Sequence, residues 1–184
     1  MPHHEANRWK GVVLGAAGSA AGVLAMRSYW RIASTLAGGD PRTQGGNPEP
    51  QALDSISLIG THRKEGESST AAMGRIAYQL IAGKAPESQE TRTTLSYVTH
   101  WVYSMLMGGI YGVVRGRAGV PDIKGGLALG LSVWLFGDEL GTPLLGVAQG
   151  PTAYPPALHA HALAAHVAYG LASSATTQAL HRLA

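Results

Sequence analysis

The sequence has no cysteine and few charged residues. The absence of cysteine from its 184 residues excludes disulfides, zinc–thiolate sites and cysteine-ligated iron–sulfur clusters. Charged residues make up 14% of the chain, against about 25% in typical soluble domains. The net charge of +3 comes from scattered basic residues without interleaved aromatics, so we find no nucleic-acid-binding pattern and expect no nucleic-acid partner.

Motifs that mark common enzyme classes are also missing. There is no G-x-S-x-G elbow and no H-E-x-x-H pair. The stretch "GAAGSAAG" has the glycines of a phosphate-binding loop, but it lies inside an apolar run and lacks the lysine that contacts phosphate. Alternation of apolar and polar residues is absent, so no strand is expected. These absences favour an all-α, non-enzymatic protein.

Four long apolar segments remain, separated by polar turns. They cover residues 9–30, 93–114, 125–147 and 154–180, each near the roughly 20 residues that cross a bilayer. They predict one membrane domain over residues 1–184, an integral membrane four-helix bundle. The first segment has tryptophans at both ends, and its Gly/Ala-rich centre favours an uncleaved span over a signal peptide.

The polar stretch 38–92 is the expected extramembrane loop. Its beginning, "GGDPRTQGGNPEP", is rich in turn residues. Residues 70–84 return to helical periodicity, with one face formed by Met73, Ile76, Ala77, Leu80 and Ile81. A short amphipathic helix on the membrane surface and a soluble packing helix both fit this pattern.

Basic residues in the short turns predict the orientation of the bundle. The turn between the second and third segments carries Arg115, Arg117 and Lys124, whereas the next turn, "AQGPTAYPP", has no lysine or arginine. The positive-inside rule therefore places the first turn and both termini in the cytoplasm. Arg27 and Arg31, at the other end of the first segment, oppose this orientation.

Small residues form stripes along the apolar segments. In lipid, small side chains let helix backbones approach, because no hydrophobic drive brings helices together. The stripes predict tight packing within the bundle or against a partner subunit. The residues assigned to helix packing are Gly11, Gly15, Gly18, Gly22, Gly108 and Gly112.

Polar side chains inside these segments predict a cluster in one leaflet. His159 and His166 are seven residues apart and share a helix face, whereas His161 points nearly the opposite way and is expected at the interface. At 1.5 Å per residue, His100 and Glu139 lie at about the same depth, roughly 10–12 Å from one surface. The predicted cluster is His100, Glu139, His159 and His166.

Three interpretations of this cluster stay open. Buried ionisable groups usually pair, so a hydrogen-bonded clasp that fixes helix register is one. A proton or ion pathway is the second. A metal, haem or pigment bound through histidine is the third, and its metal is unknown. A membrane-embedded hydrolase using the same groups is less favoured.

The second half of the chain resembles the YagU-like family of small, uncharacterised bacterial inner-membrane proteins. The resemblance rests on "GGIYGVVRGR", "LSVWLFGDELGTPLLG" and "YPPALHAHALAAHVAYG". It implies a multi-pass protein of the bacterial inner (cytoplasmic) membrane and supplies no reaction. We therefore expect a non-enzymatic structural or accessory subunit of a larger membrane complex. Its expected partners are the lipid bilayer and either other membrane subunits or a second copy.

Overall fold

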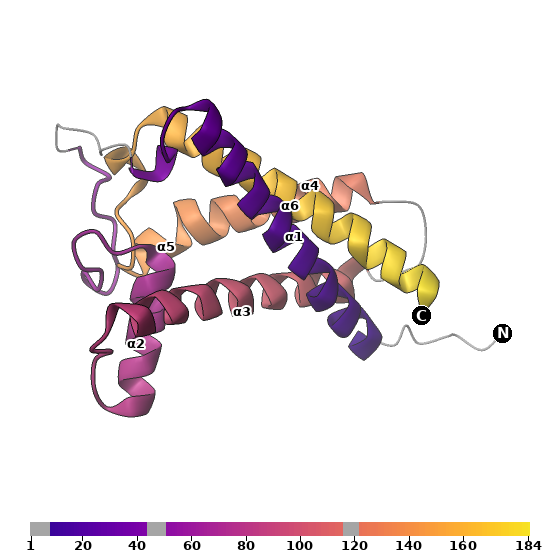
Figure 1. The fold of residues 1–184 in the computed structure, drawn as a ribbon, viewed down its shortest axis with the longest axis horizontal. Coiled ribbons are helices and arrows are strands. Elements are labelled where there is room, and N and C mark those ends of the chain that lie inside the picture. Colours follow the sequence, from indigo (N-terminus) through magenta and orange to yellow (C-terminus); the bar gives the residue numbers. More distant parts are fainter. Residues whose placement is uncertain (1–7, 44–50, 116–121) are drawn as a thin grey trace. The chain divides into compact units, whose positions relative to one another are not determined.

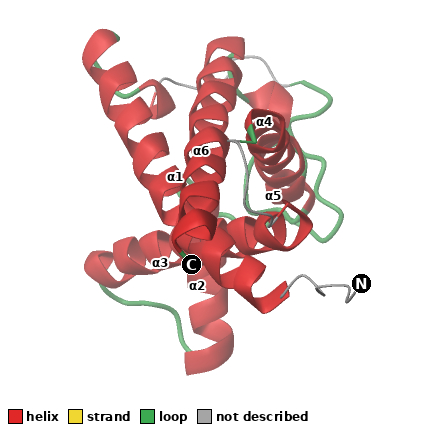
Figure 2. Ribbon diagram, turned by 90° about the vertical axis from the view of Figure 1, so that its right-hand side faces the viewer, coloured by secondary structure: helices red, strands yellow, loops and turns green. Residues whose placement is uncertain are grey.

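Regular structure is helical throughout the residues that the structure, a computed structural model, describes: 8–43, 51–115 and 122–184. Figure 2 shows helices joined by loops and, in these residues, no strand. The all-α prediction is confirmed for them. The helices are α1 (Arg8–Leu36), α2 (Ser69–Ala82), α3 (Gln89–Arg115), α4 (Ile123–Ser132), α5 (Gly141–Leu144) and α6 (Pro156–Leu183). Between them lie the 3₁₀ turns η1 (Pro41–Thr43) and η3 (Pro151–Ala153) and the π-helix η2 (Val133–Glu139).

The chain divides into two compact units, which we describe separately. The helical unit comprises Met1–Gln44, Ser104–Trp134 and Leu158–Ala184. The loop unit comprises Gly45–Tyr103 and Leu135–Ala157. Each is assembled from segments far apart in the sequence, and α3 contributes its first half to the loop unit and its second half to the helical unit.

Helix α1 packs closely on two other helices of the helical unit. Its first turns meet α3, where a Cβ added to Gly11 would lie 2.6 Å from the carbonyl oxygen of Gly112. Its middle meets α6, where a Cβ on Gly22 would lie 2.7 Å from the carbonyl oxygen of Tyr169. Figure 1 shows α1 (indigo) crossing α6 (yellow). The glycines are needed because any side chain would collide with the facing backbone.

The contact between α4 and α6 is built in the same way. A Cβ on Gly126 would lie 3.0 Å from the carbonyl oxygen of Gly170, and Gly130 abuts the backbone of His166. Asp122 caps α4 by accepting a hydrogen bond from the Gly125 amide at 2.9 Å. Glycine on both partners therefore brings this third helix pair into backbone contact as well.

The third apolar segment is not the regular helix that we expected over 125–147. After α4 the backbone widens into the π-helix, where the Leu140 amide donates to Leu135, five residues back, at 3.0 Å. A side chain at Gly141 would collide with the Phe136 carbonyl oxygen. Helix α5 then ends at Leu144, because Gly146 turns the chain at φ 66° and its amide donates to the Pro143 carbonyl at 2.9 Å. The predicted end at Val147 was wrong.

The other long helices exceed their predicted limits. Helix α1 continues six residues past the predicted end at Trp30, and α3 and α6 run for 27 and 28 residues. Among the described helices, α1 alone is both long and apolar enough to cross a membrane. Buried core helices and signal sequences share that length and composition.

Two contacts organise the loop unit. Helix α2 begins at the cap Ser68, ends at Gly83 with φ 70°, and matches the helix predicted at 70–84. It touches α3 at Gly74, where a Cβ would lie 2.9 Å from the carbonyl oxygen of Leu95. The chain before it docks on the turn after α5, since the His62 amide donates to the Gly146 carbonyl at 2.8 Å.

Candidate functional site

A line of buried polar side chains runs along α6 in the helical unit. These side chains come mostly from two adjacent positions per turn, so one edge of α6 is polar and buried. The buried polar residues of α6 are His166, Ser173, Ser174, Thr177 and Gln178. Two of them face α1, since Gly18 abuts Thr177 and Gly22 abuts Ser173.

Two tyrosine hydroxyls connect this edge of α6 to α3. The Tyr169 hydroxyl donates to the Ser104 carbonyl at 2.7 Å. The Tyr111 hydroxyl lies 2.7 Å from the Ser174 hydroxyl and 3.3 Å from the Asp122 carboxylate. Ser174 in turn donates to the Asp122 carbonyl at 2.8 Å. The network therefore joins α3, α4 and α6 through groups that satisfy one another away from solvent.

Sequence reasoning missed most of this network. The small-residue stripe identified Ser173 and Thr177, but Tyr111, Ser174 and Gln178 were not singled out. A usable signal was present: Ser174 and Gln178 are four residues apart and lie on α6 next to the stripe. Tyr111 had no such signal, because its partner Ser174 is 63 residues away on another helix and its partner Asp122 lies beyond α3, at the start of α4.

The predicted cluster of four residues is divided between the two units. His159 and His166 lie on α6 in the helical unit, whereas His100 and Glu139 belong to the loop unit. His166 is buried, and its Nδ1 lies 2.8 Å from the carbonyl oxygen of Ala162, one turn earlier. His159, His100 and Glu139 are half-buried. The clasp between these histidines and Glu139 therefore stays a prediction.

His161 contacts α1, whereas we had expected its side chain to reach the membrane interface. Its Nδ1 lies 2.8 Å from the Tyr29 hydroxyl, and its ring centroid lies 6.2 Å from that of Trp30. The Arg42 guanidinium stands over Trp30 at 5.1 Å and is paired with Asp40 at 2.6 Å. Helical arithmetic gave the direction of His161 along α6, but not which helix lies on that side.

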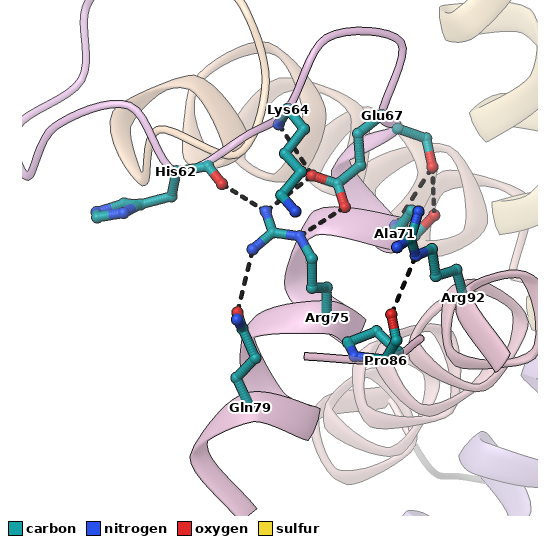
Figure 3. Close-up of polar contacts among 10 residues, drawn as sticks. His62, Lys64, Glu67, Ala71, Arg75, Gln79, Pro86 and Arg92 are labelled. Atoms are coloured by element: carbon teal, nitrogen blue, oxygen red, sulfur yellow. Dashed lines mark hydrogen bonds and ion pairs between the residues drawn. The ribbon is translucent and has the colours of Figure 1, made fainter. Parts of the chain in front are cut away.

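A buried ion pair holds the loop unit together, and Figure 3 shows it in detail. The Arg75 guanidinium grips the two carboxylate oxygens of Glu67, each at 2.8 Å, and also donates to the His62 carbonyl at 2.6 Å and to Gln79 at 3.2 Å. The Lys64 amide donates to Glu67 at 3.0 Å. Because Arg75 is only 7% exposed, this bidentate pair ties the loop at 62–67 to α2.

Hydrogen bonds in the loop unit lower the pKa values of two carboxyl groups, those of Glu67 and Asp54. Hydrogen bonds from Arg75 hold the pKa of Glu67 below its ordinary value, against the opposite effect of burial. The hydrogen bond from the Thr152 hydroxyl, at 2.6 Å, lowers the pKa of Asp54. Both carboxylates are thus stabilised in the charged form. Asp54 precedes and Glu67 follows the residues that dock on the turn after α5.

Across the described ranges 8–43, 51–115 and 122–184, no three histidine, aspartate or glutamate side chains are grouped to hold a metal ion. Comparison with known proteins identifies no relatives: no family model, no curated protein and no solved structure matches the chain. The helix-packing glycines, the Tyr111 network and the Arg75 pair are therefore the features from which function has to be argued.

Proposed function

We propose that this chain is a small multi-span protein of the bacterial inner membrane that acts as a non-enzymatic structural or accessory subunit of a larger membrane complex. The observation that carries the proposal is the distribution of residues in the helical unit. Its helices meet through glycine, serine and threonine, while large aliphatic side chains lie outside.

The outer surface of these helices is apolar along their length. The exposed aliphatic residues include Val13, Leu24, Leu106, Ile110, Val113 and Leu131. Large apolar patches are rare on monomeric soluble proteins, because water disfavours them. In a bilayer the same surface is matched to the acyl chains, and small residues supply the close helix contacts. The resemblance to the YagU-like family points to the same environment.

Contacts inside the loop unit support the up-and-down arrangement of spans. Asp54 accepts a hydrogen bond from Thr152, and the Leu58 amide donates to the Leu144 carbonyl at 3.0 Å. These bonds join the long polar loop to the turn between the third and fourth segments. Four alternating spans require those two segments on the same side of the membrane.

Single-cysteine labelling tests the membrane topology without background, because the chain has no cysteine of its own. Glu65→Cys and Ala148→Cys should react with a membrane-impermeant maleimide from one side of the membrane, and Lys124→Cys from the other. Glu65→Cys and Lys124→Cys reacting from the same side would contradict the arrangement. Reaction of all three from both sides of sealed vesicles would contradict membrane insertion.

The accessory role has a separate test. Native electrophoresis of gently solubilised membranes should place the protein in an assembly larger than the purified 19.1 kDa chain. Gly15→Leu, which obstructs a contact inside the helical unit, should remove it from that assembly. Ala17→Leu, an exposed position on α1, is the matched control. Migration of the wild-type chain as a monomer would contradict an accessory role.

The buried polar edge of α6 favours a second candidate, a proton or ion pathway or a histidine-bound metal or haem. His166 lies on the same helix as Ser173 and Thr177, and all three are buried. Purified protein with a bound cofactor would show a haem absorption band or stoichiometric metal, lost in His166→Ala. A colourless, metal-free protein whose vesicles conduct no protons or ions would contradict this candidate.

A further inference from the structure

Helix α2 has one side fixed by the loop before it. Arg75 and Gln79 point toward residues 62–67, and the guanidinium binds both Glu67 and the His62 carbonyl (Figure 3). That loop is itself hydrogen-bonded to the turn after α5, through the Gly146 carbonyl. The rotation of α2 about its own axis is therefore set, with its charged side toward the loops.

The opposite side of α2 is apolar and largely uncovered. Met73, Ala77 and Leu80 lie about 140–160° around the helix from Arg75. Leu80 is 82% exposed and its neighbour Ile81 is 88% exposed, the highest values among large aliphatics in the loop unit. Met73 is half-buried, but the described chain leaves Leu80 and Ile81 almost uncovered, although leucine and isoleucine each favour burial by about 1.5–3 kcal/mol.

The position of α2 relative to α3 suggests what covers them. Figures 1 and 2 show α2 running across the first part of α3 rather than alongside it. The crossing is fixed by Gly74 against Leu95 and by the Thr70 and Ser96 hydroxyls, 2.8 Å apart. If α3 crosses the bilayer from about Thr93, a helix that crosses it at Leu95 would lie in the plane of the membrane surface.

We infer that α2 is an interfacial anchor, whose side formed by Met73, Ala77, Leu80 and Ile81 lies in the boundary between lipid headgroups and acyl chains. This inference rests on the proposed membrane location. Amphipathic helices at this depth bury their apolar side about 5–10 Å into the boundary. Lys84, just past the end of α2, is exposed and paired with Glu87 at 3.1 Å, and in this arrangement its ammonium group would lie at the level of the lipid phosphates. Arg75 stays on the loop side, away from lipid.

Fluorescence quenching by spin-labelled lipids tests this anchor in the full-length chain. An environment-sensitive fluorophore is attached to Ile81→Cys, Glu65→Cys or Ile110→Cys, and each protein is reconstituted into vesicles of phosphatidylethanolamine and phosphatidylglycerol. The vesicles carry the nitroxide either just below the headgroup or in the middle of the acyl chain. Glu65 is the loop control, and Ile110 is an exposed aliphatic in the middle of α3.

The three positions distinguish the inference from the proposed function. For a helix at the boundary, quenching at Ile81 should exceed that at Glu65 by about threefold and be strongest with the shallow nitroxide. Ile110 should respond most to the deep nitroxide. If Ile110 is quenched but Ile81 behaves like Glu65, the anchor is wrong and the membrane location stands. If Ile110 is not quenched either, the membrane location is wrong as well.

Discussion

Different kinds of contact stabilise the interior of each unit. In the helical unit, backbones touch at glycines, and buried hydroxyls satisfy one another at Tyr111 and Ser174. In the loop unit, a buried Arg75–Glu67 pair and backbone hydrogen bonds between loops carry the structure. The two units share one helix, α3, which contributes its first half to the loop unit and its second half to the helical unit.

The contrast is physically consistent with two solvents. Lipid offers helices no hydrophobic drive for association, so close backbone approach and internal hydrogen bonds become the main stabilising contacts. A polar loop in water needs contacts that compete with hydration, such as caps and bidentate ion pairs. The two units should therefore respond to different perturbations: added volume in the helical unit, and lost charge in the loop unit.

The largest expected effect is from added volume at Gly15. In Gly15→Leu the new side chain would collide with the Gly108 carbonyl oxygen, and a Cβ would already lie 2.8 Å from the Gly112 Cα. Because backbone cannot move as a side chain can, we expect a loss of about 3 kcal/mol or more. Thermal melting in detergent measures it. Ala17→Leu, exposed on the same helix, is the control, and equal melting of both variants would contradict the contact.

These contacts also mark how far the fold could be predicted from sequence. Spacing of i, i+4 and i+7 identified the stripe on α1, because helical periodicity is local. It did not reveal that the stripe is divided, with Gly11 and Gly15 against α3 and Gly18 and Gly22 against α6. The π-helix was also missed, because its hydrogen bond between residues five apart has no recognisable periodicity in the local sequence.

The candidate site was predictable only in part, for the same reason. The spacing of His159 and His166 predicts that they share one face of α6. It does not predict contact partners, such as Tyr29 for His161, which lies 132 residues away in the sequence. Helical spacing places Arg75 away from the apolar face of α2, and says nothing of what contacts it there. Its burial depends on Glu67 and His62, in a loop without any periodic pattern. Pairings across long loops are therefore the part that sequence leaves open.

The second effect, in the loop unit, comes from removing one partner of the ion pair. Arg75→Met leaves the Glu67 carboxylate without its main partner at a side-chain exposure of 12%. Because Arg75 is buried but Glu67 is only half-buried, we expect a loss of about 2 kcal/mol, below the 3–5 kcal/mol of pairs in which both partners are fully removed from water. Proteolysis of the loop at 51–67 should accelerate, and the double variant Glu67→Gln, Arg75→Met should recover part of the loss. No acceleration in Arg75→Met would contradict the role of the pair.

The same pair should make the loop unit sensitive to acid. The pKa of Glu67 is lower in the folded protein than its ordinary value of 4.5. Its contribution to stability is therefore fully present above pH 4.5 and declines as the pH falls through the lowered folded value. The difference in melting temperature between wild type and Glu67→Gln should shrink below pH 4.5. A difference that stays constant down to strong acid would contradict this linkage.

A smaller loss is expected in the helical unit when a hydroxyl is removed from its network. Tyr111→Phe keeps the ring but deletes the oxygen that contacts Ser174 and Asp122. Ser174 keeps its bond to the Asp122 carbonyl, so no donor is stranded and the cost should be about 1 kcal/mol. Melting in detergent measures the loss. Tyr78→Phe, on α2 in the loop unit, provides the comparison, and an equal loss in both would argue against the network.

The smallest effect is expected where α1 meets the start of α6. The Tyr29 hydroxyl and the His161 Nδ1 are 2.8 Å apart and only half-buried, so water competes for both groups. A double-mutant cycle of Tyr29→Phe and His161→Ala isolates their interaction, because packing of the His161 ring on Trp30 is lost equally in both arms that carry His161→Ala. We expect a coupling of about 0.5–1 kcal/mol, near the net value of one hydrogen bond. A coupling of zero, with a large loss in His161→Ala alone, would assign the stabilisation to contact between the His161 and Trp30 rings instead.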